Sequence, residues 1–460
     1  MHILTTTSAS LDEIAEPVDL RQTPADVVAL SFTDSDLAGL ASAWKADAQR
    51  LPSMRLAALR DLRHPMSVDL WIDSVARHAK VILVRILGGY DWWRYGCDQL
   101  AATARAKGIK LALLPGECRD EDLRLIEAST LPREELAQLL DYFREGGPAN
   151  MKGLVHRLAK LAGHEALSAD PIEVPKAGYY EPELGVVPTP LSEGNPAPVI
   201  PILFYRSMLL AVDVAPIDAL TAELRQSGIA AMPIFVSSLK DRTSLAFVEA
   251  AFASHAPTAI ITATAFASGA EPGAETLFDR AGVPVFQVIV ATTRRDAWAI
   301  NQRGLAPADL AMHVVLPELD GRILAGAISF KAESELDPAL GFRAHANRPE
   351  PDRIRQVVRR IANFIRLKET PPAERLIAIL IPDYPSAPGR TGYAVGLDVP
   401  SSVLAMLHDL KQAGYTVDKI PQSPRELLDL IERGNTSLDL ETYRDMFDSL
   451  PATTREAIEA

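Results

Sequence analysis

The stretch VILVRILGGYDWWRYG, residues 81–96, gives the clearest indication of fold class in this sequence. Its first seven residues are nearly continuous in apolar side chains, which is typical of a strand buried on both faces of a parallel sheet. Two glycines then predict a tight turn, and four aromatic residues follow with one acid and one base. Ligands of open α/β sheets bind beyond the carboxyl ends of strands, so we expect a binding site at this turn.

Similar apolar runs recur along the chain and alternate with helical patterns, such as those at 216–227 and 243–254. This alternation indicates βαβ units. We therefore predict a multi-domain α/β protein with Rossmann-like or flavodoxin-like parallel sheets flanked by helices. Further strands are expected at 111–114, 199–205, 230–236, 259–265, 283–290, 312–316 and 376–381.

Proline content and periodicity divide the chain into segments. Seven prolines lie between residues 171 and 198. Because proline lacks the amide hydrogen that helices and sheets need, we expect a linker or wrapping segment there. Apolar residues at helical spacing over 350–368 predict an amphipathic helix. The predicted organisation is an N-terminal α/β domain at 1–168, a proline-rich linker at 169–198, a second α/β domain at 199–345, a connector helix at 346–374 and the start of a third α/β unit at 375–460.

Composition bounds the class of protein. The 460 residues carry a net charge of −13, which disfavours a nucleic-acid partner because phosphate-binding faces need clustered basic residues. Two widely spaced cysteines, Cys97 and Cys118, form neither a disulfide framework nor a metal knuckle. The apolar runs are much shorter than the roughly 20 residues of a membrane-spanning helix. With no signal-peptide pattern after Met1, we expect a cytoplasmic protein without a membrane partner.

The residues that follow the predicted strands are the candidates for ligand contact. Aromatic faces suit a large flat ligand, and arginine suits carboxylates at its edge. The alternative is that Trp92 and Trp93 fill a core and that Asp91 pairs with Arg94. The candidates are Tyr90, Trp92, Trp93 and Arg94 after the first quoted strand, Tyr205 and Arg206 after 199–205, and Tyr384 and Arg390 after 376–381.

Two carboxylates follow the run 312–316. Glu318 and Asp320 could accept protons or bind a metal, but the Asp-Gly sequence also predicts a turn, which we favour for Asp320. Glu318 stays a weak catalytic candidate. None of the nine histidines forms a metal-binding motif, and His156 and His164 are expected to be satisfied or solvated. No metal site is therefore predicted.

Three segments, in this order, resemble the large subunit of aerobic cobaltochelatase, a family related to the large subunit of magnesium chelatase. They are LGGYDWWRYG (87–96), VLPELDGRI (315–323) and the block 377–415, with FYRS (204–207) between the first two. The resemblance covers most of the chain from about residue 60 onward. Its motifs are short, but their order is specific.

The resemblance implies a longer subunit that binds a tetrapyrrole, which is hydrogenobyrinic acid a,c-diamide in the cobalt branch, with cobalt as substrate. It also implies two AAA+ partner subunits that bind ATP and Mg. The absence of a GxxxxGK[ST] motif from this sequence agrees with that division of labour. We expect the natural chain to continue past Ala460 and the groups that insert the metal to lie there. By itself, this chain is not expected to insert cobalt.

The sequence also departs from the family pattern. Relatives commonly have an asparagine where this chain has Asp383 and an Asn-Gly pair where it has Tyr393–Ala394, whereas Arg390 and Asp398 match. Contacts made by those asparagines would be changed here. Three alternatives stay open: a magnesium chelatase large subunit, a two-lobed α/β module that binds a small ligand, and a nucleotide-sugar transferase, whose donor-site signature we do not find.

Overall fold

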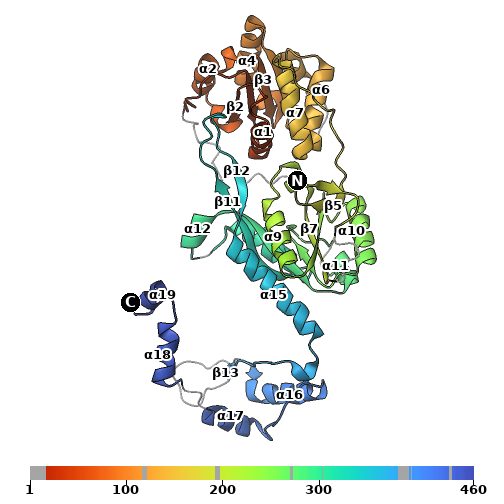
Figure 1. Ribbon diagram of the computed structural model, residues 1–460, viewed down its shortest axis with the longest axis vertical. Coiled ribbons are helices and arrows are strands. Elements are labelled where there is room, and N and C mark those ends of the chain that lie inside the picture. Colours follow the sequence, from red (N-terminus) through yellow and green to blue (C-terminus); the bar gives the residue numbers. More distant parts are fainter. Residues whose placement is uncertain are drawn as a thin grey trace. The chain divides into compact units, whose positions relative to one another are not determined.

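The predicted α/β architecture is confirmed by the structure, a computed structural model in which mixed and parallel sheets are flanked by helices (Figure 1). The chain forms two compact units, Met1–Ala362 and Asn363–Ala460. The domain boundaries drawn within and near these units stay predictions. The structure describes residues 17–116, 122–191, 197–269, 273–302, 304–381, 393–394, 396–434 and 438–459.

The first sheet of the larger unit has four parallel strands in the order β2-β1-β3-β4. The strands are β1 (Val27–Ser31), β2 (Met54–Ala58), β3 (Val81–Ile86) and β4 (Lys110–Pro115). After β2 the chain crosses back over β1 to form β3 on the other side. The loops that leave β1 and β3 therefore diverge, and a crevice at this switch point is where ligands of such sheets bind.

Helices cover both faces of this sheet because its strands are apolar on both sides. Val27 and Ala29 pack in one core cluster, whereas Val28 and Leu30 pack in the other. Helices α1 (Asp34–Ala46), α6 (Arg133–Glu145) and α7 (Gly147–Leu161) contribute to the first cluster; η1 (Leu59–Leu62), α2 (Pro65–Ser74), η2 (Ala76–His78), α4 (Arg94–Lys107) and α5 (Leu123–Ala128) contribute to the second.

The second sheet has eight strands in the order β12-β11-β10-β9-β7-β8-β5-β6. Its five central strands run parallel, and antiparallel strands extend both edges. The strands are β5 (Ala177–Glu181), β6 (Gly185–Val187), β7 (Val199–Tyr205), β8 (Ala230–Val236), β9 (Ile260–Thr262), β10 (Val285–Arg294), β11 (Ile323–Glu333) and β12 (His345–Pro349).

The helical segments of this half of the unit include the predicted ones. The patterns at 216–227 and 243–254 form α9 (Ala215–Gln226) and α10 (Arg242–His255), and the pattern at 350–368 forms α15 (Pro351–Glu369). The other segments are α8 (Arg206–Leu210), α11 (Leu277–Ala281), α12 (Arg295–Ile300), α13 (Pro307–Leu310), η3 (Ala311–Val315) and α14 (Leu316–Glu318).

The loop between β11 and β12, which we call the 334–344 strap, crosses from the second sheet to the first. Leu56 of the edge strand β2 donates its backbone N–H to the Leu340 carbonyl at 3.0 Å. The side chains of Leu340 and Phe342 are buried in the core of the first sheet. Lys45 of α1 pairs with Asp337 at 2.8 Å. These contacts fasten the two sheets of the unit to each other.

Two predicted strands are wrong. Residues 312–316 are helical, in η3 and the start of α14, because a short apolar run fits a helical turn as well as a strand. Residues 376–381 form no strand, and Leu376 is fully exposed. A strand needs a neighbour to accept its backbone hydrogen bonds, and the described residues of the smaller unit provide none beside this run.

The proline-rich segment is more ordered than a linker. Between its prolines lie β5 and β6, which pair with each other and extend the second sheet beyond β8. Pro175, Pro182 and Pro188 all fall outside these strands, so no ladder hydrogen bond is lost to them. Proline content therefore marked the ends of the strands rather than the absence of a sheet.

The smaller unit is mainly helical among its described residues, with a core formed by Val399, Val403 and Leu427. Its elements are η4 (Pro372–Glu374), β13 (Tyr393–Ala394), β14 (Leu397–Asp398), α16 (Val399–Gln412), α17 (Pro424–Arg433), α18 (Leu440–Asp448) and α19 (Ala452–Glu459). No described helix is long and apolar enough to cross a membrane.

The Leu340→Ala change is expected to destabilise the larger unit by about 2–5 kcal/mol, because it leaves a cavity in the core of the first sheet. Leu336 lies in the same strap but is half exposed, so Leu336→Ala is the matched control and should change stability by less than about 0.5 kcal/mol. Urea unfolding followed by tryptophan fluorescence measures both. Equal midpoints for the two variants would show that the strap does not anchor the sheets.

Candidate functional site

The aromatic turn lies at the switch point of the first sheet, directly after β3, and includes the short helix α3 (Gly89–Trp92). Gly88 and Gly89 have φ values of +86° and +69°, which side chains rarely adopt. A Cβ on Gly89 would also come within 2.7 Å of the Asp122 carboxylate. That carboxylate accepts a hydrogen bond from the backbone N–H of Tyr90 at 2.9 Å and caps the start of α5. The turn predicted from the two glycines is therefore present, and the Asp122 carboxylate holds it in place.

The two tryptophans of the turn have different environments. Trp93 is 4% exposed, its indole N–H donates to the Leu62 carbonyl at 2.8 Å, and its ring packs closely on Gly96. A ligand cannot stack on it, so we withdraw Trp93 as a ligand contact. Trp92 is 45% exposed, and the Arg63 guanidinium lies 5.9 Å from its ring centroid. Trp93 therefore fills a core position, as the alternative interpretation proposed, whereas Trp92 does not.

Charged side chains surround Tyr90 and the exposed indole. Asp91 pairs with Arg124 at 2.6 Å and lies 3.9 Å from Arg94, whose side chain is largely exposed. The Arg124 guanidinium also lies 4.2 Å from the Tyr90 ring centroid. The Tyr90 hydroxyl donates to Asp98, and this hydrogen bond raises the pKa of Tyr90, which keeps the phenol protonated. The turn thus presents one aromatic face with arginines beside it.

A buried arginine lies beneath the switch point. The Arg85 guanidinium donates to both oxygens of Asp36 at 2.8 and 2.9 Å, and the Ser31 hydroxyl donates to the same carboxylate at 2.6 Å. The Arg85 guanidinium also lies over the rings of Phe32 and Phe143, at 5.4 and 4.9 Å from their centroids. These contacts hold the start of α1 against the end of β3, so they shape the site from below.

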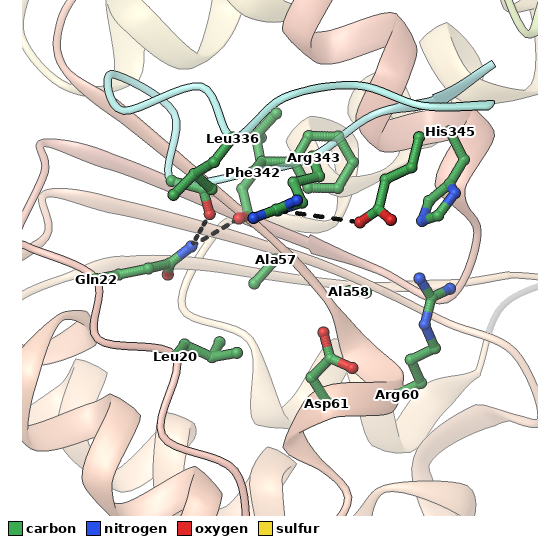
Figure 2. A pocket seen from close by; sticks show the side chains of 13 residues that line it. Leu20, Gln22, Ala57, Ala58, Arg60, Asp61, Leu336, Phe342, Arg343 and His345 are labelled. Atoms are coloured by element: carbon green, nitrogen blue, oxygen red, sulfur yellow. Dashed lines mark hydrogen bonds and ion pairs between the residues drawn. The ribbon is translucent and has the colours of Figure 1, made fainter.

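A pocket of about 210 Å³ opens beside the carboxyl end of β2 (Figure 2). Arg60 and Asp61 of η1 face it from one side, and the strap and the start of β12 close the other side. Figure 2 shows the Asp61 carboxylate and the Arg60 guanidinium directed into the same hollow. Burial raises the pKa of the Asp61 carboxyl. Ligand pockets for drug-sized molecules measure roughly 300–1,000 Å³, so this one is too small for a macrocycle.

Two other candidates serve the structure. The Tyr205 hydroxyl donates to the Ala265 carbonyl at 2.8 Å. The Arg206 guanidinium donates to the carbonyls of Val174 and Pro175 at 2.7 and 3.0 Å and pairs with Glu145 at 3.3 Å. Because these bonds occupy most of its donors, Arg206 clamps the proline-rich segment to α6, and we withdraw it as a ligand contact.

The remaining predicted positions are not gathered at the switch point. Glu318 is the last residue of α14, which precedes the strap in the sequence, and its side chain is exposed. Tyr384 and Arg390 lie outside the described residues. His156 and His164 each lie beside an aspartate, Asp47 and Asp26, at 3.3 and 3.6 Å. Among the described residues, no cluster of His, Cys, Asp and Glu could hold a metal ion.

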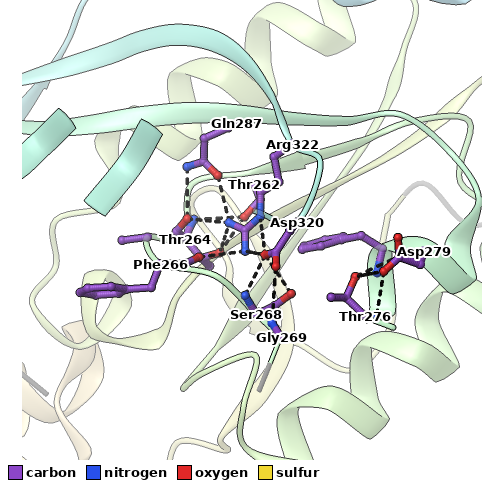
Figure 3. Close-up of polar contacts among 12 residues, drawn as sticks. Thr262, Thr264, Phe266, Ser268, Gly269, Thr276, Asp279, Gln287, Asp320 and Arg322 are labelled. Carbon is purple, nitrogen blue, oxygen red and sulfur yellow. Dashed lines mark hydrogen bonds and ion pairs between the residues drawn. The ribbon is translucent and has the colours of Figure 1, made fainter. Parts of the chain in front are cut away.

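The predicted turn at Asp320 is confirmed, and it also carries a buried ion pair (Figure 3). Asp320 and Arg322 have side chains that are 3% and 1% exposed and lie 2.6 Å apart. Arg322 donates further to Thr264, Phe266 and Gln287. Asp320 accepts from the backbone N–H of Ser268 at 2.7 Å. This carboxylate is fully engaged, so it is not available as a proton acceptor.

Several residues of the site were missed from the sequence. Arg60, Asp61 and Arg63 follow β2, a strand that we did not predict, and Arg343 and His345 approach through the strap. The short run MRLAA (54–58) has only weak strand character. A strand predicted there would have made Arg60, Asp61 and Arg63, which follow it, candidates for ligand contact. Nothing in the local sequence indicates the approach of the strap.

The sequence is similar to those of known metal chelatases. A family model described as CobN/Magnesium Chelatase matches residues 140–460. An aerobic cobaltochelatase subunit CobN of Sinorhizobium sp is 35% identical over the whole chain, and so is one of Pseudomonas aeruginosa. A magnesium-chelatase subunit of Rhodobacter capsulatus is 28% identical over 64% of the chain, and the matched part is 26% of that subunit.

A solved structure is also similar. The catalytic subunit of cobaltochelatase from Mycobacterium tuberculosis matches 93% of this chain with a TM-score of 0.68 and 28% identity. The matched part is 35% of that chain. This chain likewise spans 38% of the length of the two CobN relatives.

The tryptophan assignments predict opposite effects on stability. Trp93→Ala should lower the free energy of unfolding by about 3–5 kcal/mol, because it empties a core position. Trp92→Ala should change it by less than about 0.5 kcal/mol, because the exposed ring loses few contacts. Urea titrations followed by far-ultraviolet circular dichroism compare the two variants with the parent. A large loss in Trp92→Ala would place that ring in the core instead.

The Asp320→Asn change should also destabilise the unit, by about 3–5 kcal/mol, because it leaves Arg322 charged and buried without its counterion. Asp296→Asn removes an aspartate from an exposed arginine pair and serves as the control, with no measurable change expected. Thermal unfolding of both variants tests this assignment. Similar melting temperatures would mean that Asp320 contributes no net stability.

Proposed function

The chain belongs to the CobN/magnesium chelatase family, and we propose that it forms part of the tetrapyrrole-binding subunit of an aerobic cobaltochelatase. The proposed reaction inserts cobalt, as substrate, into hydrogenobyrinic acid a,c-diamide during cobalamin biosynthesis. The observation that carries this proposal is the 35% identity over the whole chain to CobN subunits of two organisms. The chain would correspond to the N-terminal portion of such a subunit.

The extent of similarity favours cobalt over magnesium. The two CobN relatives match the entire chain at 35% identity, whereas the magnesium-chelatase subunits of Rhodobacter capsulatus and Cereibacter sphaeroides match 64% and 80% of it at 28% and 26% identity. The solved cobaltochelatase subunit matches most of the chain as well. A corrin is therefore the proposed ring, and protoporphyrin is the ring to test against it.

The exposed side of the aromatic turn supports binding of such a ring. A conjugated macrocycle can stack on the open face of Trp92, and Tyr90 lies beside it in the same turn. Carboxylates at the edge of the ring would pair with Arg63 and Arg94, whose guanidinium groups flank the turn. We add Arg63 to the predicted contacts. Tyr205 stays a candidate although its hydroxyl donates to the Ala265 carbonyl, and Tyr384 and Arg390 stay candidates outside the described residues.

The chemistry of insertion needs groups beyond this site. A tetrapyrrole loses two pyrrole protons when it takes a divalent metal, so acceptors must lie next to its centre. In the described part of this chain, Glu318 is exposed away from the turn and Asp320 is fully paired. We therefore propose that the catalytic groups lie elsewhere in the full subunit, that AAA+ partner subunits bind ATP and Mg, and that the assembly is cytoplasmic.

Ring binding to Trp92 is tested by absorbance titration of a metal-free corrin with this chain. Trp92→Ala should weaken binding roughly three- to tenfold through the loss of aromatic stacking, while Trp92→Phe should retain most of the affinity. Tyr443→Ala removes an aromatic ring of similar exposure from α18 and is the control. Unchanged affinity in Trp92→Ala would remove the turn from the ring site, and preferential binding of protoporphyrin would favour the magnesium branch.

A further inference from the structure

We propose that the pocket between η1 and the 334–344 strap binds a neutral carboxamide group in preference to a carboxylate or an ammonium group. Arg60 and Asp61 line one side of this pocket, and Glu333, Arg343 and His345 line the other. The pocket lies at the carboxyl end of β2, where ligands of parallel sheets bind. The aromatic turn follows β3 of the same parallel sheet, so both sites lie at the carboxyl ends of its strands.

The charges that line the pocket cancel. Arg60 pairs with Asp34 at 2.9 Å, outside the pocket lining, and Arg343 lies 4.0 Å from Glu333. Two arginines of the lining therefore face two carboxylates. A bound anion would meet Asp61 and Glu333, and a bound cation would meet the arginines. Net neutrality of the lining favours an uncharged polar ligand.

The Asp61 carboxylate determines which uncharged group fits. It has no hydrogen-bond partner among the described residues, although it is partly buried and directed into the hollow (Figure 2). Because the carboxylate is only partly buried, water can reach it, and a ligand N–H that replaces this water gains a hydrogen bond to a charged acceptor. The adjacent Arg60 donates to Asp34 through one nitrogen atom, and its guanidinium carries further N–H donors for a ligand. A primary carboxamide offers an NH₂ to Asp61 and a carbonyl oxygen to Arg60 at once.

The shape of the pocket fits the rest of such an arm. Ala57 and Ala58 form its floor with small side chains, and Leu20 contributes an apolar wall. Methylene groups can lie along these surfaces while the amide reaches the charged end. At about 210 Å³ the pocket holds a side arm and not a ring. The preference for a carboxamide follows from the residues that line the pocket. The assignment of this arm to a macrocycle stacked on Trp92 rests on the proposed function.

The pocket is held open by the strap. The Gln22 amide donates to the carbonyls of Leu56 and Gly341 at 2.8 and 2.9 Å, so it joins β2 to the strap at the rim of the pocket. Both walls are thus positioned before a ligand arrives, which lowers the cost of ordering them on binding.

Saturation-transfer NMR on the 460-residue chain tests the preference, with propionamide, propionate and propylammonium as probes of similar size. Propionamide should give a saturable signal stronger than either charged probe. Asp61→Asn keeps the shape of the side chain but replaces the charged acceptor, so propionamide binding should weaken about tenfold. Asp73→Asn changes an exposed aspartate of α2 away from the pocket and should leave binding unchanged. Urea unfolding confirms that both variants fold.

Three results would overturn the proposal: no saturable propionamide signal, propionate binding as tightly as propionamide, or equal propionamide affinity in Asp61→Asn and the parent chain. The outcome is separable from that of the proposed function. Propionamide binding in a chain that binds no corrin would refute the ring proposal and leave the pocket intact. Corrin binding that depends on Trp92, without any propionamide binding, would refute the pocket and leave the ring proposal intact.

Discussion

Burial of Leu340 and Phe342 in the core of the first sheet is the contact that holds the larger unit together. It joins strand β2 to a loop nearly three hundred residues later in the chain, which is a long loop to close. The entropy of closure grows slowly with loop length, so a few buried apolar side chains can offset it. The pair between Arg206, which follows β7, and Glu145 of α6 adds a second attachment between the two halves of the unit. The strap also supplies the pocket wall that the first sheet does not have alone.

Rigid support beneath the aromatic turn explains how an exposed ring can be presented at a fixed place. Gly88 and Gly89 allow the backbone to reverse, and Asp122 holds the turn by accepting the Tyr90 N–H. Trp93 anchors the turn in the core while its neighbour Trp92 stays open. Packing of Trp93 in the core therefore fixes the position of the exposed Trp92 ring. A site on such a support is preorganised for a flat ligand.

Two buried arginines of this unit, Arg322 and Arg85, are paired with aspartates and hydrogen-bonded, which limits their chemical roles. Arg322 and Asp320 satisfy each other and the loop after β9, and Asp36 is held by Arg85 and Ser31. Buried pairs of this kind contribute little net stability when compared with apolar packing, but breaking one is costly. They are therefore scaffolding. The groups open to a ligand are the half-exposed ones at the sheet edge, among them Asp61.

Local sequence patterns were enough to predict the α/β class, strands β3, β4, β7 and β8, the main helices, the glycine turn and the family. Apolar periodicity and glycine reflect local burial and backbone freedom, so they can be recognised within short windows of sequence. Long-range packing settled which tryptophan is exposed, that Arg206 is a clamp, that 312–316 is helical, and that the strap forms a pocket with Arg60 and Asp61. Each of these depends on contacts between residues far apart in the chain, and local periodicity carries no information about such contacts.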